Sequence, residues 1–105
     1  MYYLIYKITN IDSGKFYIGK HMTDDKNDSY MGSGKYLKYA QECHGMDRFK
    51  KEILFECSSY EEMNQKEAEI VNQEFIDRDD TYNIKLGGDG GWEYINKSNK
   101  NTGLI

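Results

Sequence analysis

Two tyrosines, Tyr6 and Tyr17, occupy short apolar tripeptides whose spacing favours a shared site. The tripeptides are residues 4–6 (LIY) and residues 17–19 (YIG), and ten residues separate the two tyrosines. Turn-forming residues lie between them, which predicts a β-hairpin that brings the two hydroxyls close together. A phenol hydroxyl can orient water or donate a hydrogen bond to a phosphate. The alternative is that the two rings only pack across the hairpin.

A carboxylate and an amide side chain follow much later in the chain. Glu67 lies in a predicted helix, and Asn83 comes sixteen residues further on, in a short extended stretch. Glu67 and Asn83 are therefore candidates for the same site as the two tyrosines. Glu62 and Glu69 are alternatives on the same helix, and all three could instead form a solvated face. The spacing to Asn83 favours Glu67.

Several basic residues could bind a phosphate near these groups. Lys20 and His21 directly follow the second tripeptide, and Lys35 and Lys38 come at the start of a predicted helix. His21 could equally be an exposed loop residue. The stretch at residues 32–35 reads GSGK, which is too short for a nucleotide-binding P-loop, so the sequence does not predict ATP binding.

The order of predicted elements is strand, strand, helix, strand, helix and a short extended segment. Their ranges are 2–9, 15–19, 35–44, 49–57, from Ser58 or Ser59 to Ile76 or Asp77, and 81–84. A polar loop of about fifteen residues spans 20–34, and Gly45 follows as a helix C-cap. In the third strand, Ile53 and Phe55 alternate with polar neighbours. This order predicts an α+β fold, a small three-stranded, mainly antiparallel sheet flanked by helices.

Length and composition fit one soluble domain. The chain has 105 residues, 30% of them charged, with a net charge of −4, and its apolar runs are too short to span a membrane. Cys43 and Cys57 are expected to be reduced, partly buried thiols. Residues 87–91 form a glycine-rich loop, and residues 93–105 resemble a linker. We therefore expect a domain at residues 1–92 and a linker-like tail.

Taken together, these features resemble the GIY-YIG nuclease superfamily over about residues 2–92. The YIG motif is intact, whereas Leu4 stands where the family usually has glycine in the first motif. Residues 36–54 are similar to the corresponding region of phage homing endonucleases, and so is the helical Glu67 followed by Asn83.

The resemblance implies hydrolysis of a DNA phosphodiester bond with one Mg²⁺ or Mn²⁺ per active site. Glu67 would bind the metal, Tyr6 would act as general base and Tyr17 would position water or phosphate. Asn83 would support the geometry of the site. The cytoplasm of a bacterial or phage-infected cell is the expected location, since no signal peptide is recognisable.

One departure from the family concerns arginine. The family usually carries an arginine after YIG to bind phosphate, and neither Arg48 nor Arg78 lies in that position. Lys20 and His21 are the best substitutes, with Lys35 as a further candidate, although lysine is a point charge rather than a bidentate fork.

Two other readings of the domain stay open. They are a structure-selective repair-type nuclease and a non-catalytic nucleic-acid-binding module on the same fold. The acidic net charge predicts weak intrinsic DNA affinity, so we expect a C-terminal DNA-binding region outside this chain. The sequence leaves the oligomeric state open.

Overall fold

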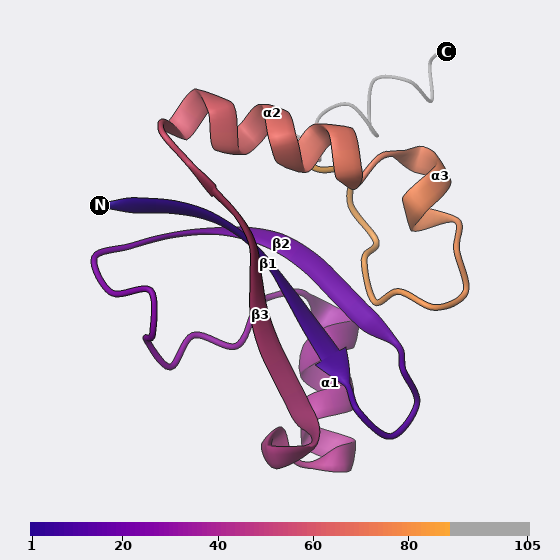
Figure 1. Ribbon diagram of the computed structural model, residues 1–105. Helices are drawn as coiled ribbons and strands as arrows, with labels where there is room; N and C mark the ends of the chain where they lie inside the picture. Colours follow the sequence, from indigo (N-terminus) through magenta and orange to yellow (C-terminus); the bar gives the residue numbers. More distant parts are fainter. Residues whose placement is uncertain (89–105) are drawn as a thin grey trace.

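A three-stranded antiparallel sheet forms the centre of the computed structural model, which describes residues 1–88 (Figure 1). The strands are β1 (Tyr2–Asn10), β2 (Phe16–Thr23) and β3 (Phe49–Cys57), in the order β2-β1-β3. The hairpin register pairs Tyr6 with Gly19, as the spacing of the two tripeptides predicts. The predicted α+β class and the three-stranded antiparallel sheet are confirmed.

Helices cover both faces of this sheet. They are α1 (Lys35–His44), the 3-10 turn η1 (Met46–Arg48), α2 (Tyr60–Ile70) and the short α3 (Gln73–Ile76). Alternate residues of a strand point to opposite faces, so β1 supplies both cores. Ile5 packs with Met63 and Val71 on the α2 face. Tyr6 and Ile8 pack with Leu37 on the α1 face.

Strand β2 is longer than predicted. Its residues 20–23 continue the antiparallel pairing with β1, so Lys20 pairs with Ile5 and His21 with Leu4. Both basic residues therefore lie on a strand and not in the loop, which spans residues 24–34. The prediction failed because these polar residues have little strand propensity of their own, and the long partner strand provides their hydrogen bonds.

Strand β3 contains a bulge that the alternating pattern did not predict. Ile5 pairs with Phe55 while Tyr6 pairs with Ile53, so Leu54 is an extra residue on β3. The extra residue interrupts the alternation, so Ile53 and Phe55, two positions apart, face opposite sides of the sheet. Ile53 and Phe55 are 38% and 43% exposed, so they are not core residues.

The predicted long second helix is broken in two. Helix α2 ends at Ile70, and Val71 is its C-cap residue. The Asn72 side chain then accepts a hydrogen bond from the Phe75 backbone N–H and begins α3. The break directs Phe75 back towards the sheet, where its ring packs edge-on against Phe16. Asn72 is the local signal for this break, because asparagine is favoured at an N-cap.

Two predicted caps are present, and one prediction about cysteine is wrong. Gly45 is the C-cap of α1 with a φ of 94°, and Ser59 caps α2 by accepting a hydrogen bond from the Glu62 N–H. Cys57 is buried as expected, but Cys43 is exposed on α1. No helix within residues 1–88 is long and apolar enough to cross a membrane. The predicted domain boundary at residue 92 and the predicted tail at residues 93–105 lie outside the described residues.

Candidate active site

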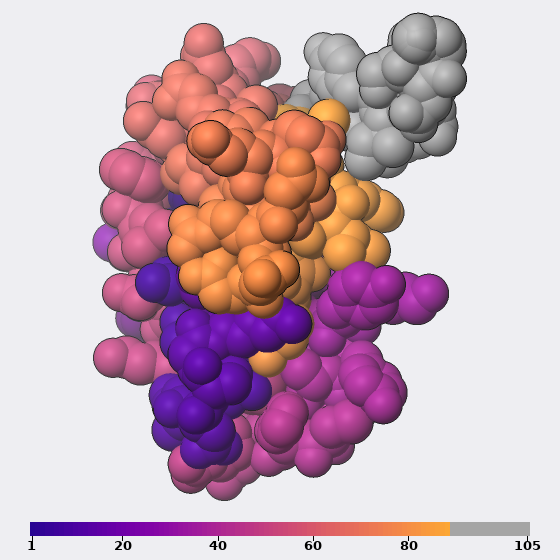
Figure 2. Space-filling model, turned by 90° about the vertical axis from the view of Figure 1, so that its right-hand side faces the viewer, coloured from indigo at the N-terminus to yellow at the C-terminus, as the bar shows by residue number. Residues whose placement is uncertain are grey.

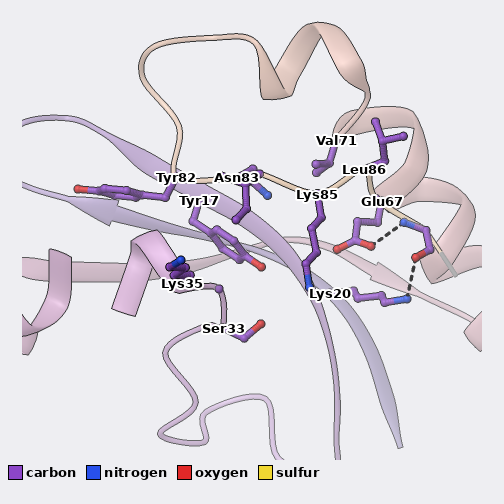
Figure 3. Close-up of a pocket in the computed structure, with 14 residues that line it drawn as sticks. Tyr17, Lys20, Ser33, Lys35, Glu67, Val71, Tyr82, Asn83, Lys85 and Leu86 are labelled. Carbon is purple, nitrogen blue, oxygen red and sulfur yellow. Dashed lines mark hydrogen bonds between the residues drawn. The ribbon is translucent and has the colours of Figure 1, made fainter. Parts of the chain in front are cut away.

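A cavity of about 640 Å³ opens along the outer edge of β2 (Figure 3). Residues from β2, α2, the end of the 24–34 loop, the start of α1 and the segment after α3 line it. The polar lining residues are Tyr17, Lys20, Ser33, Lys35, Glu67, Tyr82, Asn83 and Lys85. Figure 2 looks onto this side of the molecule, where the orange segment around residues 73–88 lies beside α1 in magenta. The cavity thus contains most of the predicted site residues.

Residues 80–83 close the edge of β2 above the cavity. The Phe16 N–H donates to the Asp80 carbonyl (3.0 Å), and the Tyr82 N–H donates to the Phe16 carbonyl (2.8 Å). The Asn83 side chain then accepts from the Ile18 N–H (3.0 Å) and donates to the Ile18 carbonyl (2.7 Å). The Asn83 amide thus replaces a neighbouring strand. Because both of its polar atoms have backbone partners, its role is to position the edge.

Glu67 projects from α2 into the cavity. Its side chain is half-buried, and Oε1 accepts a hydrogen bond from the Gly88 N–H at 2.8 Å. Burial raises the pKa of the Glu67 carboxyl, although the N–H groups of Gly88 and Lys20 and the Lys20 charge act in the opposite direction. The carboxylate therefore retains uncompensated negative character, which a bound cation would stabilise.

A glycine allows the chain to pass this close to Glu67. A Cβ atom on Gly87 would lie 2.4 Å from the Glu67 carbonyl oxygen, so no larger residue fits without a shift. The close approach places the following Gly88 N–H against the carboxylate. The glycine-rich character of this loop is thus explained at Gly87 by packing against α2.

Lys20 connects two walls of the cavity. Its ammonium group donates to the Asn64 side-chain oxygen on α2 and to the Gly88 carbonyl, the latter at 3.3 Å. The charge of Lys20 also lowers the pKa of Glu67, acting against burial. Lys20 therefore holds α2 and the Gly88 loop together beside the carboxylate.

Of the two tyrosines in the tripeptides, Tyr17 is the one that lines the cavity. Its side chain is half-buried, and its hydroxyl points into the cavity towards the side on which Glu67 lies (Figure 3). Burial raises the pKa of Tyr17, and a contact with the Ser33 side chain partly offsets this effect. At neutral pH, Tyr17 is therefore a neutral hydroxyl that can donate or accept a hydrogen bond.

Tyr6 lies behind Tyr17 and does not line the cavity. It is 2% exposed, and its hydroxyl makes no hydrogen bond of ordinary geometry with any described residue. Burial raises its pKa far above the usual range, and the nearby Tyr17 raises it further. A free phenolate at this position, as a general base would require, is strongly disfavoured.

Gly19 explains how the two tyrosines meet. A Cβ atom at this position would lie 2.7 Å from the Tyr6 hydroxyl and 2.8 Å from the Tyr17 ring. The two ring centroids are 6.2 Å apart. The glycine of the YIG motif is therefore required by close packing. The spacing argument correctly predicted that Tyr6 and Tyr17 come together.

His21 lies outside the cavity lining, on the α1 face of the sheet. Its ring stacks on Tyr30 with a centroid distance of 3.8 Å, and Nε2 lies 2.8 Å from the Asp28 carboxylate. The same carboxylate accepts hydrogen bonds from Thr23 (2.8 Å) and Lys51 (3.1 Å). The hydrogen bond to His21 is the largest of the effects that hold the pKa of Asp28 well below its usual range. His21 thus anchors the 24–34 loop.

Neither arginine occupies the cavity. Arg48 pairs with Asp12, and Arg78 pairs with Asp80, both on exposed surface. The charged lining residues are instead Lys20, Lys35, Lys85 and Glu67, a formal charge of +2. Lys38 is outside this lining. The cavity is therefore locally positive on a chain whose net charge is −4.

Two lining residues, Ser33 and Lys85, and the Lys20 partner Asn64 were not predicted from the sequence. Asn64 precedes Glu67 by three positions, so helical periodicity could have placed it on the same face. Lys85 follows Asn83 by two positions in an extended stretch, which was a weaker signal. Ser33 carries no pattern that separates it from other polar loop residues.

The donor set suits a metal that keeps most of its own water. Within residues 1–88, no group of three or more His, Cys, Asp or Glu side chains is placed to hold an ion. Mg²⁺ often binds proteins through one or two carboxylates, with waters and substrate phosphates completing its shell. Glu67, a half-buried carboxylate that lacks full compensation, fits this mode.

Relatives of the chain occur in Enterobacteria phage T4. A protein named "Putative endonuclease segD" is 57% identical over 86% of this chain and 40% of its own length. "Putative endonuclease segB" is 51% identical over 91% of this chain and 43% of its own length, and "Endonuclease segA" is 40% identical over 86% and 41%. The chain therefore spans less than half the length of each of these relatives. No protein-family model and no solved structure matches it.

Proposed function

We propose that the chain is the catalytic domain of a metal-dependent DNA endonuclease of the GIY-YIG type. The observation that carries the proposal is that the Glu67 carboxylate and the Tyr17 hydroxyl line one cavity with three lysines. This combination offers a metal ligand, a group that can orient water and a positive surface for a phosphate. The names of the phage relatives support nuclease activity.

Glu67 is the residue that would hold one Mg²⁺ or Mn²⁺ ion. When bound, such an ion neutralises charge that develops on the phosphate during hydrolysis. The hydrogen bond from Gly88 fixes one oxygen of the Glu67 carboxylate. Lys20, bound to Asn64 and Gly88, keeps the surrounding walls in place.

The tyrosines act as neutral hydroxyls in this proposal. Tyr17 faces the cavity and orients the attacking water, while the Tyr6 hydroxyl behind it acts as a positioning group. The water oxygen forms a bond to phosphorus and one P–O ester bond breaks. The attacking water loses a proton to solvent, and the leaving alkoxide oxygen takes a proton from solvent. The raised pKa values of Tyr6 and Tyr17 favour this role over proton abstraction by a free phenolate.

The proposal extends to the biological setting. The phage origin of the relatives supports a homing-type enzyme acting in the cytoplasm of an infected cell. Because the chain spans only 40–43% of the segB, segD and segA relatives, we propose that target selection belongs to a further region of a full-length enzyme.

Plasmid cleavage tests the proposal directly. The chain should nick supercoiled DNA with Mg²⁺ or Mn²⁺ and should be inactive with EDTA. Replacing Glu67 with glutamine should lower cleavage at least about a hundredfold, because the metal loses its carboxylate. Glu69→Ala is the matched control, since Glu69 is exposed on the same helix and pairs only weakly with Lys66 at 3.7 Å. If the wild-type chain cuts no supercoiled, linear or branched DNA with either metal, the proposal is wrong.

A further inference from the structure

The three lysines that line the cavity differ in how much of their hydrogen-bonding capacity is free. The Lys20 ammonium group already donates to the Asn64 side chain and to the Gly88 carbonyl. Moving it onto a phosphate would break the link between α2 and the Gly88 loop. Lys20 is therefore better suited to positioning Glu67 than to binding DNA.

Lys85 has the opposite character. Its side chain is exposed, and it has no ion pair or hydrogen bond with any residue in the described part of the chain. Its ammonium group thus has all three donors available. In Figure 3 the Lys85 side chain extends across the cavity between the Tyr17 and Glu67 side chains.

The backbone that carries Lys85 is held at both ends. Asn83 is bound to both backbone groups of Ile18, and the Gly87 N–H donates to the Val71 carbonyl at 2.8 Å. These bonds fix the Lys85 segment against β2 on one side and against the end of α2 on the other. A flexible lysine side chain on a fixed backbone segment can move to bind a phosphate while the surrounding structure stays in place.

Other basic groups are less suited to the same task. Arg48 and Arg78 are paired with aspartates outside the cavity, and His21 is stacked on Tyr30 and bound to Asp28. Lys35 is also unpaired among the described residues, but it lies beyond the Tyr17 ring from Glu67 (Figure 3). Only Lys85, among the unpaired lysines of the lining, lies between the Tyr17 and Glu67 side chains in this view.

We propose that Lys85 binds the DNA phosphate that is hydrolysed, in a cavity whose lining contains no arginine, while Lys20 positions Glu67. This assignment rests on the proposed nuclease function. It gives Lys85 the phosphate contact for which the sequence offered Lys20 and His21. Lysine contributes a point charge to the non-bridging phosphate oxygens, where an arginine would bind them with two parallel hydrogen bonds.

DNA binding without metal tests Lys85 independently of cleavage. Binding of the 105-residue chain to a fluorescent DNA duplex is measured by anisotropy in EDTA over a series of KCl concentrations. Lys85→Ala should weaken binding about tenfold and reduce the slope of log K against log salt by about 1. Lys85→Arg should keep the slope. Lys50→Ala is the matched control, because Lys50 is exposed on β3, the opposite edge of the sheet.

Single-turnover cleavage at saturating DNA separates the two lysines. Lys85→Ala should slow cleavage about a hundredfold, and Lys85→Arg should recover most of the loss, because the charge acts on the reacting phosphate. Lys20→Ala should keep the wild-type salt slope but lose cleavage. It should also reduce the increase in melting temperature that Mg²⁺ produces, because the Glu67 walls loosen.

The outcomes distinguish this assignment from the proposed function. If Lys85→Ala matches Lys50→Ala in affinity, salt slope and cleavage, the assignment to Lys85 is wrong even though the enzyme is active. If Lys20→Ala, and not Lys85→Ala, reduces the slope of log K against log salt, Lys20 is the phosphate contact and the assignment to Lys85 is also wrong. If the wild-type chain never cuts DNA, the nuclease proposal fails, whereas a reduced slope in Lys85→Ala would still identify Lys85 as a phosphate contact.

Discussion

Tyr6 shows the chemical character of this site at the scale of a single residue. Its ring fills the core on the α1 face, where phenylalanine would pack equally well. Its hydroxyl is buried without a hydrogen-bond partner of ordinary geometry among the described residues. An unsatisfied buried polar group costs stability, so retaining it favours a functional role.

We therefore predict opposite effects of Tyr6→Phe on stability and on activity. The variant should be more stable to urea by about 1 kcal/mol, because an unsatisfied hydroxyl is removed. Cleavage should fall at least about tenfold, because a group that positions Tyr17 or water is lost. Equilibrium unfolding and single-turnover cleavage measure the two effects.

Tyr82→Phe provides the contrasting control for stability. The Tyr82 hydroxyl accepts a hydrogen bond from the buried Asn10 side chain at 3.2 Å. Its removal leaves Asn10 without that partner and should destabilise the fold by about 1 kcal/mol. If Tyr6→Phe destabilises the chain to a similar extent, or cleaves DNA like the wild type, the functional interpretation of the Tyr6 hydroxyl is wrong.

At the scale of the elements, the outer edge of β2 is the structure on which the site depends. Residues 80–83 hydrogen-bond the outward-facing backbone groups of β2 at Phe16 and Ile18. Further along the same edge, the Glu67 carboxylate accepts a hydrogen bond from the Lys20 backbone N–H. The edge that would otherwise be free to pair with another chain thus borders the groups that we propose to be catalytic. On the α1 face, Asp28 fixes the 24–34 loop to β2 and β3 through His21 and Lys51.

Asn83→Ala should destabilise this arrangement strongly. The variant loses two buried hydrogen bonds to Ile18 and leaves both backbone groups unsatisfied, so we expect a loss of about 2–3 kcal/mol in unfolding free energy. Urea denaturation measures it. Asn72→Ala, which removes the N-cap of α3, is the control and should cost about 1 kcal/mol. Equal losses of unfolding free energy in the two variants would contradict the role of Asn83 in holding the edge of β2.

At the scale of the whole molecule, charge is distributed unevenly. The chain has a net charge of −4, yet the charged residues that line the cavity carry +2. In the proposed function, this contrast would orient DNA towards the cavity without giving high affinity. Glu67 is the one acid among the described lining residues, and its burial connects the stability of the fold to pH and, in the proposed function, to metal binding.

Glu67→Gln should raise the melting temperature at neutral pH when no metal is present. The pKa of Glu67 is raised in the folded state, so its contribution to stability is complete below the unfolded pKa and is lost as pH rises through the folded value. The advantage of the variant should therefore appear as pH rises from about 4 to 7 and vanish at the acid end. Differential scanning calorimetry at several pH values measures it.

With Mg²⁺ present, the wild type should have a higher melting temperature than Glu67→Gln. The ion stabilises a folded state that binds it, so the melting temperature of the wild type should rise with Mg²⁺ concentration while that of Glu67→Gln should not. Glu69→Ala should behave like the wild type, because Glu69 is an exposed residue outside the cavity. An equal response of wild type and Glu67→Gln to Mg²⁺ would show that Glu67 does not hold the ion.

Short-range patterns were sufficient to establish the order of the elements, the antiparallel hairpin and the meeting of Tyr6 with Tyr17. Strand alternation, turn residues and caps act between near neighbours, so the local sequence carries them. The extension of β2 and the bulge at Leu54 depend instead on pairing with β1, which no local pattern contains.

The division of labour within the site was decided by contacts between distant residues. Lys20 meets Asn64 across 44 positions and Ile18 meets Asn83 across 65. Sequence alone placed Lys20 and His21 together as phosphate-binding candidates because they are adjacent. On a strand, adjacent side chains point to opposite faces, so the fold directs Lys20 to Glu67 and His21 to Asp28. Lys85 remains an unpaired cation of the cavity lining among the described residues.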